Sequence, residues 1–237
     1  MKLGSGMRRK ARYGLLWMAA LLVACTASTR LEAAAKYGTL LVFGDSYTQA
    51  TWSGVPTWAE QLRRAGAVQL VGNYARGGAT AGGANTGRGT FDGQLDEWTR
   101  NGKRLARRTV VYFGYNDINR RLDLGVSGRA YAAGVDRLLR AGANRDGRRV
   151  LLTVIHDWST IPVGQKGQRP RVDAWNRTVR NVARARGLRT IDLFAKINAV
   201  YRAPRSYNIV NVTTPSRTNP GHLYMDAAHF GYRGQGI

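Results

Sequence analysis

Segments of strand character alternate along this chain with segments of helical periodicity, and this alternation limits the possible folds more than any other feature. The expected strands are Thr39–Phe43, Val68–Val71, Thr109–Phe113, Val150–Ile155 and Thr190–Leu193. The expected helices are Pro56–Ala65, Gln94–Asn101, Ala130–Ala143 and Val172–Arg186. The strands are short apolar runs, and the helices carry apolar residues at helical spacing. Strands that alternate with helices form a parallel sheet covered on both faces, so we predict an α/β fold.

The bulk composition fits one folded domain with a basic surface. The chain has 237 residues, of which 43% are hydrophobic and 9% aromatic, and this excludes a disordered protein. Its 37 Lys and Arg residues against 14 Asp and Glu give a formal net charge of +23. The basic residues are spread along the chain, which favours anionic lipid or polysaccharide surfaces as partners. We expect a monomer without a specific nucleic-acid partner.

The first 36 residues differ from the rest of the chain and indicate export. A basic segment precedes an apolar run, Leu15–Ala24, which is too short to span a bilayer, so we interpret 1–24 as a signal peptide. Leu22-Val-Ala-Cys25 matches the bacterial lipobox pattern, in which Cys25 becomes lipidated; the alternative is ordinary cleavage nearby. Cys25 is the only cysteine, so no intrachain disulfide can form. The sequence predicts a tether over 25–36, a domain over 37–237, and a cell-envelope lipoprotein or secreted protein.

The segment Gly44-Asp45-Ser46 directly follows the first expected strand. Ligand sites of α/β sheets form at the carboxyl ends of the strands. A serine on a tight turn there can act as a nucleophile if a base lies near it. The pattern is not Gly-x-Ser-x-Gly, so it differs from the turn that carries the nucleophile of α/β-hydrolases. These three residue types are also common in turns, so the segment alone favours a structural turn over a catalytic one.

Three further blocks follow in order along the chain. They are Asn73-Tyr-Ala-Arg-Gly-Gly-Ala-Thr80, Gly114-Tyr-Asn-Asp117 and Asp226-Ala-Ala-His229. With Gly44-Asp45-Ser46, these blocks resemble the GDSL, or SGNH, hydrolase family from about Tyr37 to the C-terminus, with most similarity to its lipase and phospholipase-like branch. The resemblance implies a three-layer α/β/α sandwich with a central parallel sheet of about five strands. It also implies a serine ester hydrolase that uses no cofactor.

The resemblance assigns Ser46 as the nucleophile, His229 as its base and Asp226 as the carboxylate that orients the histidine. The residue types suit these roles, because a serine hydroxyl needs a base and imidazole has a pKa near neutrality. The spacing of Asp226 and His229 puts both side chains on one side of a helical turn or tight loop. Read alone, the pair favours an Asp at a helix start and a surface His, and the other blocks shift the interpretation to catalysis.

Negative charge develops on the carbonyl oxygen when a serine attacks an ester, and it requires hydrogen-bond donors already in place. The expected donors are the backbone N–H groups of Ser46 and Gly78 and the side-chain amide of Asn116. A glycine at position 78 allows close approach of the backbone, and Asn116 follows a strand and a glycine turn. The alternative for Asn116 is a residue that caps this turn.

The remaining polar and aromatic residues are given structural or binding roles. We expect Asp45 and Asp117 to shape their turns, His156 to serve a structural role or to line the pocket, and His222 to lie at the surface. Aromatic residues near the motifs either pack on the substrate or belong to the core, namely Tyr47, Trp52, Tyr115 and Trp158. The three scattered histidines and single cysteine show no metal-ligand spacing, so no metal site is expected.

These features predict an exported serine ester hydrolase that cleaves carboxylic esters of lipids or acylated carbohydrates through an acyl-serine intermediate. One alternative is a polysaccharide O-deacetylase on the same fold. A second is a surface lipoprotein that binds polyanions and retains a catalytically weak fold, which the net charge favours. Loops determine the shape of the acyl pocket, so the sequence does not define acyl length.

Overall fold

The computed structural model describes residues 37–236 except 84–86, 159–167 and 227. The predicted signal peptide, Cys25 and the tether lie outside the described residues, and their assignments stay predictions. Within the described part of the chain, no helix is both long and apolar enough to cross a membrane.

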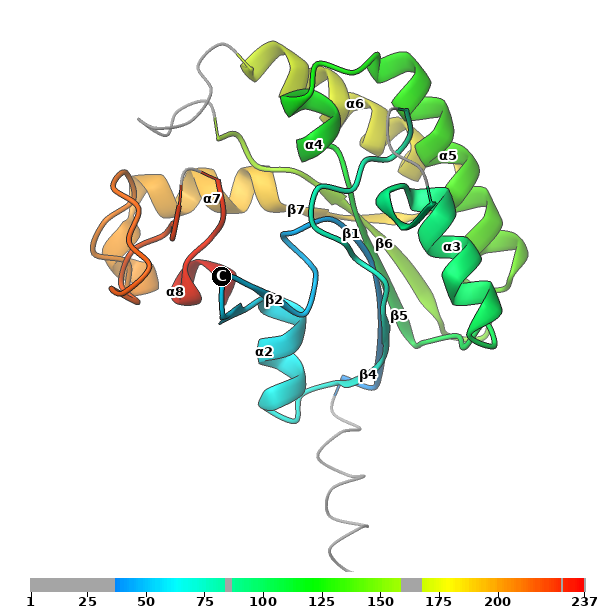
Figure 1. The fold of residues 1–237 in the computed structure, drawn as a ribbon, viewed down its shortest axis with the longest axis horizontal. Coiled ribbons are helices and arrows are strands. Elements are labelled where there is room, and N and C mark those ends of the chain that lie inside the picture. Colours follow the sequence, from blue (N-terminus) through cyan, green and yellow to red (C-terminus); the bar gives the residue numbers. More distant parts are fainter. Residues whose placement is uncertain (1–36, 84–86, 159–167, 227, 237) are drawn as a thin grey trace, which may run out of the picture.

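A parallel sheet of five strands forms the centre of the molecule, as Figure 1 shows. Its strands are β1 (Thr39–Gly44), β4 (Gln69–Asn73), β5 (Arg108–Tyr112), β6 (Arg149–Val154) and β7 (Arg189–Asp192). Their order across the sheet is β4-β1-β5-β6-β7, and every neighbouring pair is parallel. Residues 40–43 of β1 are at most 3% exposed, because helices cover both faces. The predicted sheet is therefore confirmed.

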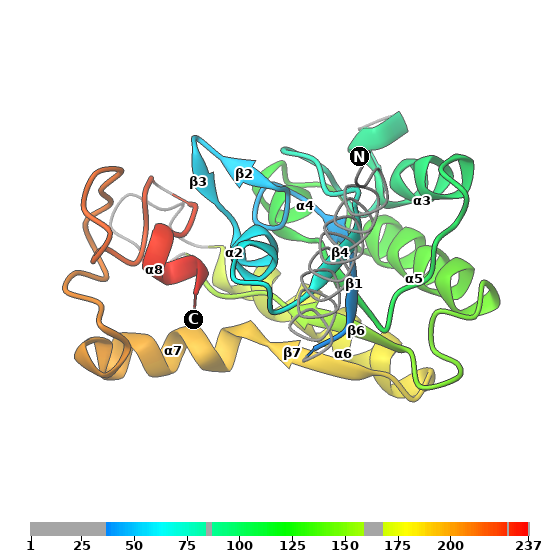
Figure 2. The ribbon, with the colours of Figure 1, turned by 90° about the horizontal axis from the view of Figure 1, so that it is seen from below.

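Helices cover both faces of this sheet and complete the predicted three layers. The helices are α2 (Trp58–Arg64), α3 (Phe91–Arg100), α4 (Tyr115–Asn119), α5 (Leu124–Arg140), α6 (Arg169–Ala185), α7 (Leu193–Arg202) and α8 (Tyr232–Gln235). Two short 3-10 segments are η1 (Gly87–Gly89) and η2 (Pro204–Tyr207). In Figures 1 and 2, α3 and α5 lie on one side of the sheet and α2 and α7 on the other.

Helices α3 and α5 begin earlier than the sequence pattern predicts, because capping residues precede the apolar periodicity. Asp123 accepts hydrogen bonds from the backbone N–H groups of Gly125 and Val126, so α5 begins at Leu124 and not at Ala130. Thr90 similarly accepts from a backbone N–H in the first turn of α3. Caps therefore determine these boundaries.

Helix α7 and a small antiparallel hairpin are absent from the sequence prediction. Asp192 ends β7 and accepts a hydrogen bond from the backbone N–H of Ala195, so the chain enters α7 directly from the strand. The hairpin pairs β2 (Thr51–Trp52) with β3 (Val55–Pro56) and follows the Ser46 turn. Its strands have two residues each, too few to give an alternating pattern in the sequence.

Candidate active site

Contacts from β5 and α3 hold the turn that carries Ser46. Gly44 ends β1, and a Cβ at this position would lie 2.5 Å from the carbonyl oxygen of Tyr112, so only glycine fits. The side-chain amide of Gln94 accepts from Gly44 N–H at 2.9 Å and donates to Gly44 C=O at 2.7 Å. Asp45 accepts the backbone N–H of Tyr47 at 3.0 Å, which is the turn-shaping role expected for it. Ser46 is therefore presented at the carboxyl end of β1 by a fixed backbone.

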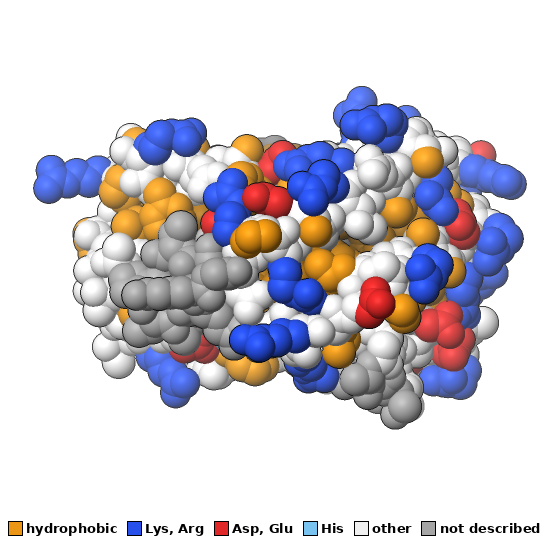
Figure 3. All heavy atoms as spheres, turned by 90° about the horizontal axis from the view of Figure 1, so that it is seen from above, with side chains coloured by type: hydrophobic (Ala, Val, Ile, Leu, Met, Phe, Trp, Pro, Cys, Tyr) orange, Lys and Arg blue, Asp and Glu red, His pale blue; other side chains and the backbone are white. Residues whose placement is uncertain are grey.

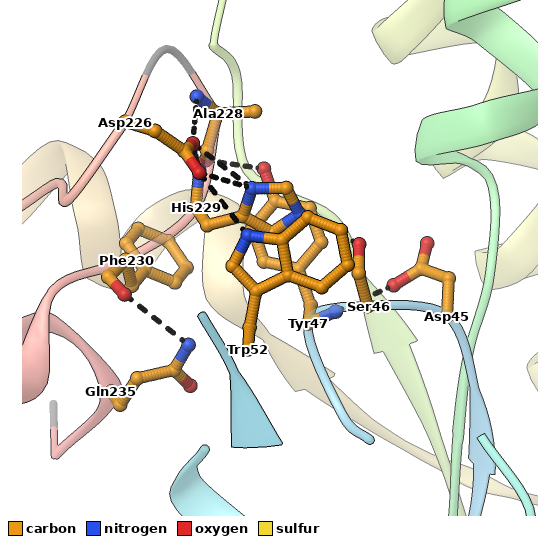
Figure 4. Close-up of polar contacts among 9 residues, drawn as sticks. All are labelled: Asp45, Ser46, Tyr47, Trp52, Asp226, Ala228, His229, Phe230 and Gln235. Carbon is orange, nitrogen blue, oxygen red and sulfur yellow. Dashed lines mark hydrogen bonds and ion pairs between the residues drawn. The ribbon is translucent and has the colours of Figure 1, made fainter. Parts of the chain in front are cut away.

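Ser46, His229 and Asp226 lie in one hydrogen-bonded chain, although 183 residues separate the serine from the histidine. Ser46 Oγ lies 2.7 Å from His229 Nε2. On the other side of the ring, His229 Nδ1 lies 2.9 and 3.0 Å from the two carboxylate oxygens of Asp226. Figure 4 shows the three side chains in this arrangement. The structure thus brings together the three residues that the sequence analysis selected.

The environment of Asp226 keeps its carboxylate ionised. Burial opposes ionisation, but hydrogen bonds from the His229 side chain and from the backbone N–H groups of His229 and Ala228 outweigh it and hold the pKa of Asp226 below its usual range. An ionised carboxylate only accepts hydrogen bonds, so His229 carries its proton on Nδ1. Nε2 is then free of a proton and can accept one from Ser46.

A tight turn, and not a helix, holds Asp226 and His229. Met225 N–H donates to the backbone carbonyl of His229 at 2.8 Å, which closes the turn. The hydroxyl of Tyr47 donates to the carbonyl of Ala228 at 2.5 Å and so links the turn to the segment after Ser46. His229 is only 9% exposed. His229 is therefore held by contacts from two distant parts of the chain.

Gly78 and Asn116 lie near the Ser46 turn, as expected for donors to an oxyanion. Asn116 Nδ2 donates to the carbonyl of Ala79 at 2.9 Å and lies 3.5 Å from Asp45 Oδ2. Gly78 has a φ of +75°, in the left-handed region that favours glycine. The bond between Asn116 and Ala79 therefore joins the two predicted donor segments next to Ser46.

Asp117 shapes the same region, as its position in the sequence predicts. Its buried carboxylate accepts the backbone N–H of Ala81 at 3.0 Å, which ties the start of α4 to the loop after Gly78. Burial raises the pKa of Asp117, and hydrogen bonds oppose the rise. The residue thus fixes the loop without contact to Ser46.

The other two histidines lie apart from this hydrogen-bonded chain. His156 is fully buried, and its ring centroid lies 4.5 Å from that of Phe230 and 5.3 Å from that of Tyr47. Burial lowers the pKa of His156 to about 3, so the ring is neutral near pH 7. His222 Nδ1 contacts the carbonyl of Thr214 at 2.6 Å. His156 therefore packs with Tyr47 and Phe230 in an aromatic wall behind the site.

Aromatic residues surround the site, and most belong to the core. Tyr47 is 2% exposed and Trp158 is 1% exposed. Tyr115 packs on Trp158 with ring centroids 4.5 Å apart, and burial, followed by the charge of Asp45, raises the pKa of Tyr115 to about 12. Trp52 alone among the four contacts the histidine and its carboxylate, a position the sequence analysis does not predict.

A cavity of about 580 Å³ lies on the other side of the wall formed by Tyr47 and Phe230. Its lining comes from α2, α7, α8 and one face of the sheet and does not include Ser46.

Among the described residues, no cluster of His, Cys, Asp or Glu is suited to a metal ion. Figure 3 shows Lys and Arg side chains scattered over the face of the molecule seen from above.

Comparison with known proteins agrees with this geometry. A model of the GDSL-like lipase/acylhydrolase family matches residues 42–235. The chain belongs to this family. A member of the GDSL-like lipase/acylhydrolase family is a carboxylic ester hydrolase, and the predicted class of enzyme is confirmed. No curated protein sequence matches the chain.

Solved structures with the same fold include several esterases. The acetyl xylan esterase AlAXEase has 19% identity and a TM-score of 0.59, over 83% of this chain and 93% of its own. The acetylxylan esterase Axe2 from Geobacillus stearothermophilus has 17% identity and a TM-score of 0.54, over 84% and 91%. The psychrotrophic esterase EstA from Pseudoalteromonas sp. has 16% identity and a TM-score of 0.54, over 84% and 90%. These similarities show that the chain has the same fold as the three esterases.

Proposed function

We propose that this GDSL-like hydrolase cleaves carboxylic esters through an acyl-enzyme formed on Ser46. The observation that carries the proposal is the hydrogen-bonded chain from Ser46 Oγ through His229 to Asp226. In the first step, His229 Nε2 takes the Ser46 proton while Oγ attacks the carbonyl carbon of the ester. The electron pair of the carbonyl moves onto its oxygen. The N–H groups of Ser46 and Gly78 and the amide of Asn116 are the proposed donors to this oxyanion.

Collapse of the oxyanion breaks the bond to the leaving alkoxide, and His229 returns its proton to that oxygen. The acyl group then remains on Ser46. Water attacks the acyl-serine, His229 takes a proton from the water, and the acid is released as Ser46 regains its proton. Asp226 accepts the Nδ1–H bond throughout and stabilises the imidazolium without taking its proton. Apart from the ester and water, every group in these steps belongs to this chain.

Removal of acyl groups from a polysaccharide is a second candidate, and it uses the same steps. Its support is that AlAXEase and Axe2, two enzymes with this fold, are acetylxylan esterases. The ordered triad argues against a protein that only binds polyanions. Export, with lipid on Cys25, is proposed from the basic and apolar N-terminal segments and Leu22-Val-Ala-Cys25.

The test is an ester panel from acetate to palmitate, together with acetylated xylan, measured on the purified protein and two variants. Ser46→Ala should lose at least about 10³-fold in kcat, because no other group replaces the nucleophile. Ser206→Ala removes an exposed serine from η2 and is the matched control, with unchanged rates. Full activity in Ser46→Ala would overturn the proposal, and the preferred ester decides between the two substrate classes.

A further inference from the structure

The hairpin β2–β3 brings one tryptophan over the proposed base. Its two turn residues, Ser53 and Gly54, have φ values of +46° and +81°, which suit a two-residue hairpin turn. Thr57 N–H donates to the carbonyl of Ala50 at 3.3 Å and closes the base of the hairpin. The turn geometry and this closing bond fix where Trp52 lies.

Trp52 contacts both members of the His229–Asp226 pair. Its ring stacks on the His229 imidazole with centroids 4.1 Å apart and an interplanar angle of 25°. Its indole N–H donates to Asp226 Oδ2 at 3.1 Å. Figure 4 shows the indole lying across the histidine with its nitrogen toward the carboxylate. One side chain therefore contacts the ring and the carboxylate together.

Gly77 leaves the space that the indole occupies. A Cβ at position 77 would lie 3.1 Å from Trp52 Cζ3 and 3.3 Å from the side-chain oxygen of Gln49, closer than ordinary contacts. The indole therefore lies against the backbone next to Gly78 as well as on His229. This packing restricts movement of the indole.

We propose that Trp52 is a positioning residue that holds Asp226 and His229 in the geometry needed for proton transfer, an inference that rests on the proposed function. The backbone N–H groups of Ala228 and His229 both donate to Asp226 Oδ1. The indole N–H donates to the other oxygen, Oδ2, and so fixes its position. The ring face stabilises the imidazolium that forms when Ser46 gives up its proton. Both contacts act through His229 and not on the ester.

Among the described residues facing His229, Asp226 is the titratable group that carries charge near pH 7. Ser46, Tyr47 and Trp52 face it from the segment after β1, and His156 faces it from the end of β6. Burial keeps His156 neutral and raises the pKa of Tyr47. His156 and Tyr47 therefore do not change charge near pH 7.

The experiment compares Trp52→Phe and Trp52→Ala with the unaltered protein on a small soluble ester over pH 5 to 8. Trp52→Phe removes the N–H donor and keeps an aromatic face, and kcat should fall about tenfold. Trp52→Ala removes both, and its kcat should be lower still. KM should change less than twofold in each variant. The apparent pKa of the acidic limb should be about half a unit lower in Trp52→Ala than in Trp52→Phe, because the ring face no longer stabilises the imidazolium.

Two further variants make the result specific. Gly77→Ala places a Cβ against the indole and should lower kcat in the same direction by a smaller factor. Trp58→Phe alters a tryptophan of α2, on the other side of the wall, and should leave kcat and the pH profile unchanged.

An unchanged kcat and pH profile in Trp52→Ala would overturn the inference. A raised KM with unchanged kcat would also overturn it, since Trp52 would then contact the substrate and not position the base. If Ser46→Ala or His229→Ala keeps full turnover, the proposed function itself fails. If both lose turnover while Trp52→Ala does not, only the role of Trp52 fails.

Discussion

Replacing Asp226 with asparagine should invert the proton position on His229. In the structure, Oδ1 accepts the backbone N–H groups of Ala228 and His229, while Oδ2 accepts the indole N–H of Trp52. The oxygen of an asparagine would keep the two backbone bonds and place its NH₂ group at the Oδ2 position. An NH₂ group is a hydrogen-bond donor, so it could not accept from the indole N–H and would instead donate to His229 Nδ1. Nε2 would then carry the proton and could no longer accept one from Ser46.

The expected loss follows from this change of tautomer. An analogous Asp-to-Asn change in a serine protease, the reference case for such triads, lowers kcat about 10⁴-fold. The backbone bonds of the 225–229 turn remain in Asp226→Asn, so we expect a loss of about 10³-fold to 10⁴-fold, and a loss at least as large in His229→Ala. The assay is kcat on a soluble nitrophenyl ester between pH 5 and 9. The rate of the unaltered protein should rise as the imidazole loses its proton.

Asp173→Asn is the matched control, because it makes the same change at a half-exposed carboxylate that pairs with Arg169 on α6. It should leave kcat unchanged. A kcat for Asp226→Asn within tenfold of the unaltered protein would refute the reasoning about the tautomer.

Three further predictions concern stability, the N-terminus and charge. His156 is held neutral by burial with a pKa of about 3, while an unfolded histidine titrates near 6.5, so the unfolded chain binds the extra proton between these values. Stability should therefore fall as pH drops from about 6.5 toward 3, and His156→Phe should flatten this part of the denaturation profile while His222→Phe should not. Cys25→Ser should release the protein from the membrane fraction, and intact-mass analysis should show a lipidated N-terminus only in the unaltered protein; a mature N-terminus beyond residue 25 would contradict this. Activity on anionic vesicles should fall with salt while turnover of a soluble neutral ester stays constant, because exposed charges are screened over about 8–10 Å at physiological salt; equal loss on both substrates would contradict it.

The sequence predicts the sheet from local patterns, and it predicts the triad residues from the resemblance of short motifs to a known family. Continuous apolar runs mark β1, β5 and β6, since both faces of these strands are buried. Ser46 and the pair Asp226 and His229 lie in short motifs whose geometry depends on adjacent residues. Such features are visible without knowledge of the tertiary contacts.

The remaining features depend on contacts between distant segments. Trp52 meets Asp226 only because a two-residue hairpin turns it back over a loop 174 residues later in the sequence. Gly134 permits Phe91 to lie against α5, where a Cβ would be 2.4 Å from the phenyl ring, so a glycine that is unfavourable in an isolated helix is required by packing. The role of His156 also depends on its burial, which no local sequence pattern predicts.

The most direct test of the central claim is to identify the residue that becomes covalently modified. A fluorophosphonate suits the experiment, because it reacts with the activated hydroxyl of a nucleophilic serine. After reaction with a fluorophosphonate and proteolysis, mass spectrometry should find the adduct on Ser46 at one equivalent per chain, with no labelling in Ser46→Ala and strongly slowed labelling in His229→Ala. An adduct on another residue, or labelling that persists at the same rate in Ser46→Ala, would contradict the assignment of Ser46 as the nucleophile.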